Sequence, residues 1–428
     1  MDYSKYGLVK FYCTADKPIA SLHCGEEINY TLTLTGDGEV IGAPYFKWEI
    51  RGDDGNCKEG FLDGTSGKIS VTGKAEKPGF LRIRAWICDE EKNEIKGDNI
   101  KPFVGGAVAD GEKCTPTLPT PDDFDAFWAG QIPRLDPVSP DLIEAKEIDS
   151  GSEDFRAFII KIKCPEEKCG GFAIGTLTYP KNAEKSSLDL GMGFVGYGLG
   201  VTGVSRQKGR VYLHVCAHPM EQDRDKAYYD SLGLAGYGLQ REDHIVPETS
   251  YFVGMILRDI QALRFMKRYF SSEGGKSLDG APTDEWKGLW NEENIHIAGG
   301  SQGAFQSLAI SALVPDRVKS CFVRYPWLSN VASVTDETRI MSTFLPKFAD
   351  GMRYFDSVSF AERIKAPLEI VTGMADTLCL PASMFMVYNA AKVPAKITFI
   401  QAMPHGTGGN DPTDTERDTH SKNGFVEK

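Results

Sequence analysis

Residues 1–105 carry short runs in which apolar and polar residues alternate. These runs occupy positions 28–34, 46–50 and 81–87, and clusters rich in glycine and aspartate separate them. Alternation of this kind, punctuated by turn residues, predicts a small β-sandwich of immunoglobulin-like type. We interpret the sandwich as a docking or oligomerisation domain in preference to a sugar-binding module, because no ladder of exposed aromatic residues is evident.

A segment rich in threonine and proline follows at positions 115–121 and predicts a linker. After it, Asp122 or Asp123 is placed to cap a short amphipathic helix. The apolar face of that helix would consist of Phe124, Phe127 and Trp128. We therefore assign residues 106–139 to the linker and this entry helix.

Residues 140–428 show strands alternating with helices. The segment 250–270 has apolar residues at helical spacing, and shorter helices are predicted after Ser301 and over positions 382–391. This order indicates an α/β fold with a mostly parallel sheet that helices cover on both faces. The predicted strands occupy positions 155–163, 172–178, 190–195, 210–215, 295–298, 318–323, 368–372 and 396–400.

Composition narrows the classes of function. The 428 residues include 41% hydrophobic and 25% charged residues, which is ordinary for a globular protein. The formal net charge of −12 argues against nucleic acid or an anionic membrane as a partner, and it suits a neutral substrate such as a carbohydrate ester. No apolar run is long enough to cross a bilayer.

The N-terminal segment lacks a basic stretch followed by an apolar one, so no signal peptide is predicted. Ten cysteines are scattered through a chain far larger than a disulfide-stapled domain. Both features favour reduced thiols and a cytoplasmic location. A leader removed from the mature protein would change that expectation to secretion.

The strongest chemical signal is the pentapeptide Gly299-Gly300-Ser301-Gln302-Gly303. It follows a short apolar strand and precedes a helix, which is the context of a nucleophile elbow. The glycines on either side let the strand and the helix approach, and the turn places the serine hydroxyl at a helix N-terminus. The motif predicts Ser301 as a nucleophile in an α/β-hydrolase fold.

A serine hydroxyl needs a base, and the base needs an orienting acid. In this fold the acid and then the histidine follow the nucleophile along the chain. Asp376 ends the loop after the strand at 368–372, and His405 ends the loop after the strand at 396–400. All three residues therefore lie past the carboxyl ends of their strands, and we predict that they form a Ser-His-Asp triad.

The other histidines compete weakly for the role of base. His420 lies in a polar tail and His23 in the β-domain, while His244 has no assigned role. His214, Cys216 and His218 alternate along one segment and suggest a metal cluster, but no further ligand accompanies them at metal spacing. We therefore predict no metal and no organic cofactor.

Two glycine-rich segments resemble phosphate-binding loops and fail on context. The segment Gly198–Gly203 reads G-x-G-x-x-G after a strand, but too few residues separate it from the next strand for a helix. The tripeptide Gly275-Lys276-Ser277 resembles the end of a P-loop, but Phe270 stands where the first glycine is required. Neither segment predicts a nucleotide.

The segment from Asp122 to His405 is similar to the carbohydrate esterase family of acetyl xylan esterases and cephalosporin C deacetylases. The similarity rests on the entry helix, on Gly300-Ser301-Gln302-Gly303, and on the acid loop from Thr372 to Asp376. Further matches lie before the strand that leads to Asp376 and just after Asp376 itself. They are Tyr354-Phe355-Asp356, Arg363-Ile364-Lys365-Ala366-Pro367, Cys379 and Pro381.

The resemblance implies the same triad and adds an oxyanion hole. Its donors would be the backbone N–H of Gln302 and that of Phe194, which stands where relatives usually have tyrosine. Aromatic residues after the strand ends are candidate contacts for the acyl or sugar group, although core packing explains them equally well. These candidates, together with His218, are Tyr197, Tyr325 and Trp327.

Three departures mark a divergent member. Relatives carry Arg-Gly-Gln where this chain has Ala217-His218-Pro219, and glutamate where Gly406 follows the histidine. The segment from Asn330 to Gly351 is also shorter than its counterpart. A homo-oligomer is the assembly that the family implies, and these departures leave open whether this chain forms it.

The sequence therefore predicts a serine esterase that removes acetyl or other short acyl groups from acetylated carbohydrates such as xylan or xylo-oligosaccharides. Its partner would be a small-molecule or oligosaccharide ester. Two alternatives remain: a serine peptidase of the oligopeptidase type, which shares the fold, and a non-catalytic carbohydrate-binding protein built on it.

Overall fold

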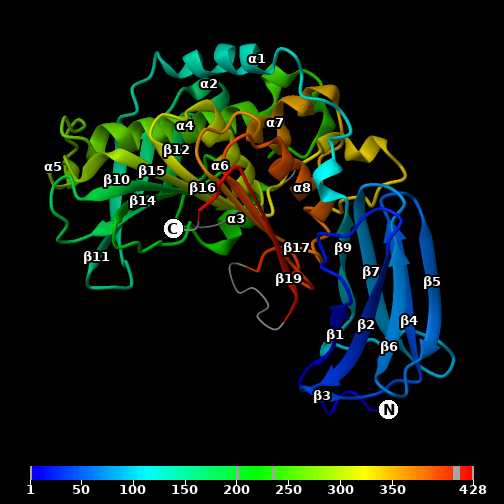
Figure 1. Cartoon of the computed structure of the whole chain (residues 1–428). Helices are drawn as coiled ribbons and strands as arrows, with labels where there is room; N and C mark the ends of the chain where they lie inside the picture. The colour runs from blue at the N-terminus through cyan, green and yellow to red at the C-terminus, as the bar shows by residue number, and fades with distance from the viewer. Residues whose placement is uncertain (1, 199–201, 234–236, 408–414, 427–428) are drawn as a thin grey trace.

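The computed structural model describes the chain except residues 1, 199–201, 234–236, 408–414 and 427–428. An all-β region at the N-terminal end packs beside a larger α/β body (Figure 1). No helix in the described part of the chain has the length and apolar character needed to cross a membrane.

The all-β region consists of two sheets with a common core. Alternate side chains of both sheets point into that core, including Leu32, Phe46 and Ile83, as the alternation in the sequence predicts. One sheet contains β1 (Val9–Ala15), β2 (Glu27–Gly36), β3 (Glu39–Val40), β6 (Lys68–Lys74) and β8 (Ile100–Lys101). The other contains β4 (Tyr45–Gly52), β5 (Cys57–Asp63), β7 (Gly79–Cys88) and β9 (Phe103–Ala109).

Strand β9 crosses position 105, so the β-structure extends to Ala109. The linker then leads to α1 (Phe124–Gln131), the expected entry helix, whose Phe124, Phe127 and Trp128 are buried. Asp123 occupies the N-cap position, without a side-chain hydrogen bond to the helix.

The α/β body is built on a ten-stranded sheet. In spatial order its strands are β10 (Leu142–Ile148), β11 (Phe155–Lys163), β12 (Phe172–Pro180), β14 (Arg210–Val215), β13 (Leu188–Phe194), β15 (Trp290–Gly300), β16 (Val318–Arg324), β17 (Leu368–Gly373), β18 (Ala395–Ile400) and β19 (Arg417–Lys422). The six strands from β14 to β18 run parallel, and the strands at both edges are antiparallel. The predicted central strands are confirmed, whereas β10 and β19 were not predicted, and His420 lies in β19 and not in a free tail.

Four helices cover one face of this sheet, each in contact with the next in the row: α4 (Tyr251–Phe270), α6 (Gln302–Leu313), α7 (Ser357–Ala361) and α8 (Pro381–Ala390) (Figure 1). Short helices α2 (Glu166–Cys169) and α5 (Thr283–Trp286) contact α4.

The prediction that helices cover both faces is wrong. On the opposite face, α3 (Lys226–Leu232) packs near β11 and β12 through Tyr229, but His296, Ser320 and Thr398 remain partly exposed. The reason is connectivity: the described residues between β13 and β14 form loop, and β18 is followed by β19 and not by a helix.

Candidate active site

Ser301 lies in the turn between β15 and α6, with φ 57° and ψ −122°. This left-handed backbone is strained for a residue with a side chain, so the surrounding structure must hold it. The Ser301 N–H donates to the carbonyl of Arg324 at 3.0 Å, and its carbonyl accepts from the N–H of Trp327 at 3.1 Å. The end of β16 and the loop after it therefore hold the turn through these two hydrogen bonds.

The glycines that flank Ser301 are required by sterics. A Cβ atom on Gly299 would collide with the carbonyl of Gly303, and one on Gly303 would collide with the carbonyl of Phe194. Both separations are well below 3.0 Å, which real Cβ atoms do not show. The sequence prediction that these positions need glycine is confirmed by this geometry.

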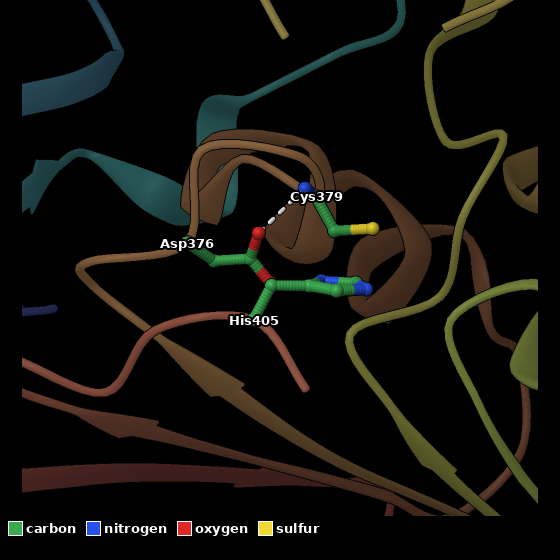
Figure 2. A group of neighbouring side chains, drawn as sticks. All are labelled: Asp376, Cys379 and His405. Atoms are coloured by element: carbon green, nitrogen blue, oxygen red, sulfur yellow. Dashed lines mark hydrogen bonds and ion pairs between the residues drawn. The ribbon is translucent and has the colours of Figure 1, made fainter. Parts of the chain in front are cut away.

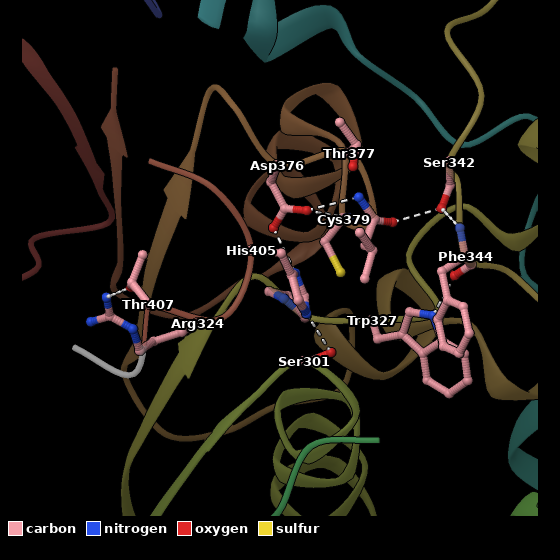
Figure 3. Close-up of polar contacts among 12 residues, drawn as sticks. Ser301, Arg324, Trp327, Ser342, Phe344, Asp376, Thr377, Cys379, His405 and Thr407 are labelled. Atoms are coloured by element: carbon pink, nitrogen blue, oxygen red, sulfur yellow. Dashed lines mark hydrogen bonds and ion pairs between the residues drawn. The ribbon is translucent and has the colours of Figure 1, made fainter. Parts of the chain in front are cut away.

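The structure brings Ser301, His405 and Asp376 together, as the order of the motifs predicts (Figure 3). The Nε2 atom of His405 lies 2.9 Å from the hydroxyl of Ser301, and Nδ1 lies 2.8 Å from Oδ2 of Asp376. Serine, imidazole and carboxylate thus form one hydrogen-bonded chain. Such a chain allows the imidazole to take a proton from the serine while the carboxylate holds its tautomer.

Asp376 is nearly fully buried, and backbone donors compensate its second oxygen. Oδ1 accepts from the N–H of Leu378 at 2.9 Å and from that of Cys379 at 2.8 Å (Figure 2). The carboxylate is therefore held in place by its own loop while Oδ2 faces His405. This arrangement leaves the carboxylate one orientation in which to serve the histidine.

The two predicted oxyanion donors lie at the start of α6 and at the end of β13, which meet beside the nucleophile turn. Gln302 is the first residue of α6, where N–H groups have no partner within the helix. Phe194 is the last residue of β13 and pairs with Val215 and Gly299 of the neighbouring strands. Farther along the same loop, a Cβ atom on Gly196 would lie 3.8 Å from that of Ser301, so the segment after Phe194 passes beside the nucleophile.

Three of the predicted substrate contacts gather near Ser301. The Tyr325 ring lies 4.5 Å from the His405 ring, measured between centroids. Trp327 packs against Tyr197 at 5.5 Å and stacks on Phe344 at 5.7 Å, and its indole N–H donates to the Phe344 carbonyl at 2.8 Å (Figure 3). Tyr325 and Trp327 are buried. Sequence reasoning missed Phe344, because the loop that carries it has no periodic pattern.

His218 lies one layer farther from the nucleophile. Its ring contacts Tyr197 at 6.2 Å and Tyr237 at 4.2 Å, and Nδ1 lies 2.6 Å from the hydroxyl of Tyr251. The side chain is completely buried, and burial beside the Arg258 guanidinium lowers its pKa to about 3. The imidazole is therefore neutral at working pH. Arg258 itself is buried and donates to the Ala217 carbonyl at 2.8 Å.

The suspected metal cluster does not form. His214 binds the carbonyl of Gly203 at 3.1 Å and Cys216 packs in a small apolar cluster, so the three side chains have separate environments. Among the described residues, ligand atoms lie close together in two other groups: Asp376 with Cys379 and His405 (Figure 2), and His23 with Asp110 and Glu112.

In both groups some of the ligand atoms already have protein partners. In the first, both ring nitrogens of His405 are within hydrogen-bond distance of Ser301 and Asp376. In the second, Asp110 binds His23 and Lys113, each at 2.9 Å. His244, which had no predicted role, is buried between Ser250 and the carbonyl of Gly238. Of the segment Gly198–Gly203, residues 199–201 lie outside the described part of the chain.

Comparison with known proteins places this chain in a family. A family model described as acetyl xylan esterase (AXE1) matches residues 111–418. A curated protein named acetyl esterase Axe7A, from Xylanibacter ruminicola, is 25% identical over 378 residues, which are 80% of this chain and 76% of that protein.

Solved structures show the same fold. Acetyl xylan esterase 1 from a Thermoanaerobacterium species superimposes with a TM-score of 0.52 at 20% identity, over 69% of this chain and 92% of that one. An acetyl xylan esterase from a Paenibacillus species gives 0.54 at 18% identity, over 69% and 93%. The predicted α/β-hydrolase fold is confirmed for the larger part of the chain.

Proposed function

This chain belongs to the acetyl xylan esterase family, and from that membership we propose that it removes acetyl or other short acyl groups from acetylated carbohydrates such as xylan or xylo-oligosaccharides. The family establishes a carboxylic ester hydrolase of the acetyl esterase type. The observation that carries the finer proposal is the hydrogen-bonded chain from Ser301 through His405 to Asp376, with links of 2.9 and 2.8 Å.

In the proposed reaction the Ser301 hydroxyl attacks the ester carbonyl as Nε2 of His405 takes its proton. Asp376 keeps Nδ1 protonated beforehand and stabilises the imidazolium afterwards. The tetrahedral intermediate collapses, and His405 gives the proton to the departing sugar hydroxyl. Water then attacks the acyl-serine with His405 again as base, which releases the carboxylic acid and restores Ser301. Every proton in this cycle passes through Nε2.

The negative charge on the carbonyl oxygen needs donors that are in place before the reaction. We propose the N–H of Gln302 as one donor, because the first N–H of α6 points out of the helix beside Ser301. We propose the second donor at the end of β13, where Phe194, the last residue of that strand, is the residue that the family resemblance indicates. One such donor is typically worth about 3–4 kcal/mol of transition-state stabilisation.

Bulky aromatic side chains support the preference for a short acyl group. Tyr325 lies against His405, and Trp327 packs with Tyr197 and Phe344 a short distance away. Rings that fill the space around a nucleophile leave room for a methyl group more readily than for a long chain, and their faces suit the apolar faces of a sugar.

The test is acetate release from acetylated xylo-oligosaccharides, measured beside the variant Ser301→Ala. We expect release by the wild type and none above background from the variant, because alanine keeps the backbone and removes the nucleophile. A 4-nitrophenyl ester series from acetate to octanoate would then rank acyl length, with acetate expected first. Equal activity of the variant and the wild type would contradict the assignment of Ser301.

Two further assays separate this function from its alternatives. Cleavage of peptide amides in place of esters would favour a peptidase. Failure of a fluorophosphonate to label Ser301 would favour a non-catalytic protein. If the wild type hydrolyses simple acetyl esters but leaves acetylated xylo-oligosaccharides intact, the result supports the triad and contradicts the proposed carbohydrate substrate.

A further inference from the structure

The side chain of Gln401 connects the loop of His405 to the N-terminal all-β region. Gln401 follows β18 directly and is completely buried. Its Oε1 accepts from the N–H of Gly106 at 3.0 Å, and its Nε2 donates to the carbonyl of the same residue at 3.0 Å. One amide thus satisfies both backbone groups of a residue in β9, which lies 295 positions earlier in the chain.

Two adjacent glycines make this approach possible. A Cβ atom on Gly105 would collide with Oε1 of Gln401, and one on Gly106, whose φ is +159°, would collide with the carbonyl of Leu81. Because Gly105 in β9 has no side chain, it leaves the space that the amide of Gln401 occupies. If the amide of Gln401 were removed, the buried backbone N–H and C=O of Gly106 would each lose a hydrogen bond.

Only three residues separate Gln401 from His405. Ala402 has a left-handed backbone with φ 58°, Met403 is completely buried, and Pro404 has a fixed φ. The Met403 carbonyl accepts from the N–H of Ala375, next to Asp376, at 3.2 Å. Because this connection is short and constrained, we expect a displacement of Gln401 to shift the imidazole.

A second contact from the all-β region supports the loop of Asp376. Buried Asp53, after β4, accepts from the N–H of Ile340 at 2.9 Å, and Arg339 lies 3.7 Å from its other oxygen. The loop that begins at Ile340 then binds the residues just after Asp376. Its contacts there are from the N–H of Thr343 to the Thr377 carbonyl at 2.9 Å and from the Ser342 hydroxyl to the Leu378 carbonyl at 2.7 Å.

We propose that the N-terminal all-β region is a positioning element of the active site, in which Gln401 and Gly106 fix the loop of His405 while Asp53 supports the loop of Asp376. This inference rests on the proposed role of His405 as base. It gives the N-terminal all-β region, which extends to Ala109, a part in the reaction that needs no ligand bound to this region. Gln401 and Asp53 do not touch the reacting atoms and act through the loops that they hold.

The test compares Gln401→Met with Asn389→Leu in the full-length protein. Methionine keeps the length of the side chain and removes both hydrogen bonds. Asn389, in α8, is the matched control because its Nδ2 also donates to backbone carbonyls in the segment after β9, at Gly111 (2.9 Å) and Cys114 (3.1 Å), but it does not lie in a catalytic loop.

We expect kcat for 4-nitrophenyl acetate to fall about 10- to 100-fold in Gln401→Met with KM little changed, since small misplacements of catalytic groups have effects of this size. Asn389→Leu should keep kcat within about twofold at a similar loss of Tm. The second-order rate of labelling of Ser301 by a fluorophosphonate should fall in parallel with kcat. Titration of labelled sites counts the folded, active fraction, so that partial unfolding does not imitate a loss of kcat.

A variant on the other side of the contact tests the direction of the effect. Gly105→Ala should displace Gln401 from within the all-β region and lower kcat, although its Cβ would also lie 2.6 Å from the ring of Phe103. If the displacement acts through Gln401, the double variant Gly105→Ala/Gln401→Met should be no slower than Gln401→Met alone.

Equal kcat and labelling rates in Gln401→Met and Asn389→Leu would overturn the positioning role and reduce the contact to one of stability. Additive losses in the double variant would overturn the path through Gln401. If Ser301 of the wild type does not react with the fluorophosphonate at all, the proposed function fails, and the inference fails with it. If the wild type hydrolyses esters and the variants have the same kcat as the wild type, this inference is overturned and the proposed function is not.

Discussion

Gly303, at the start of α6, lies against the carbonyl oxygen of Phe194, at the end of β13, with no room for a Cβ atom between them. This contact sets how closely the nucleophile helix approaches the sheet. We predict that Gly303→Ala lowers the free energy of unfolding by about 1–3 kcal/mol through overpacking and removes most of the esterase activity. Urea unfolding and 4-nitrophenyl acetate turnover measure the two effects.

Gly130→Ala is the control for that change. Gly130 lies in α1 with open space where its Cβ would be, so alanine should be neutral or slightly stabilising there. Full activity and unchanged stability in Gly303→Ala would mean that α6 moves freely on the sheet.

Asp376→Asn is predicted to leave the fold intact and to lower kcat by about 10⁴, the size of loss known for the same change in a serine protease triad. The asparagine oxygen can still accept from the N–H groups of Leu378 and Cys379, which places its NH₂ group toward Nδ1 of His405. The imidazole would then carry its proton on Nε2 and could not accept one from Ser301.

The kinetic measurement needs a folded variant, which circular dichroism and Tm establish. A loss of tenfold or less would show that the carboxylate has only a minor part in orienting His405, and that the neighbouring Tyr325 ring or the loop itself is sufficient.

Asp259 predicts a pH dependence of stability. This residue of α4 is completely buried, its Oδ2 accepts from Nε2 of Gln306 at 2.8 Å, and burial raises its pKa to about 8. The pKa of aspartate in an unfolded chain is about 3.9, so between these two values the folded state binds more protons. The free energy of unfolding should therefore fall as pH rises through this window, by at most about 1.4 kcal/mol per unit from this group.

Asparagine at position 259 keeps an acceptor for Gln306 and removes the titration. Urea unfolding of the wild type and of Asp259→Asn at pH 5, 6, 7 and 8 should show a smaller decline in the variant. Parallel declines would contradict the inference that the folded carboxyl group is protonated.

The cysteines give a prediction for thiol chemistry. In the described chain, which includes all ten cysteines, every thiol is free; Cys57 in β5 is exposed, Cys24 is partly exposed and the other eight are buried. Burial and a hydrogen bond to Asp110 raise the pKa of Cys24 to about 11, which suppresses its thiolate. A disulfide-exchange reagent such as DTNB should therefore label one thiol quickly in the native protein and ten after denaturation.

Cys57→Ser should remove the fast phase and leave nine thiols in the denatured protein. Fewer than ten thiols in the denatured wild type, without added reductant, would show that disulfides form and would contradict the expectation of reduced cysteines.

Local patterns in the sequence were enough for much of the fold. The strands at 155–163 and 210–215 have the predicted bounds, and the predicted helix after Ser301 is present, because burial on one or both faces leaves a regular apolar period. Edge strand β19 has no such period. Its residues Arg417–Lys422 are all polar or charged and are held by pairing with β18, so the segment read as a tail.

The sequence by itself determined which residues meet at the candidate active site. A glycine-flanked serine between a strand and a helix, followed by an aspartate and a histidine at later strand ends, leaves little choice of arrangement, because the ends of parallel strands meet at one edge of a sheet. Composition and the order of elements likewise determined an all-β region followed by an α/β body.

Only the tertiary structure decided what surrounds the triad. The pairing of Gln401 with Gly106, the support of Ile340 by Asp53, and the neutral His218 beside Tyr251 depend on contacts between distant segments. Such contacts leave no local period, because they are single polar groups placed by the packing of whole sheets. The same reason explains the partly uncovered face of the large sheet. The described parts of the connections from β13 to β14 and after β18 contain no helix to cover it, and the residue pattern of the strands does not show this.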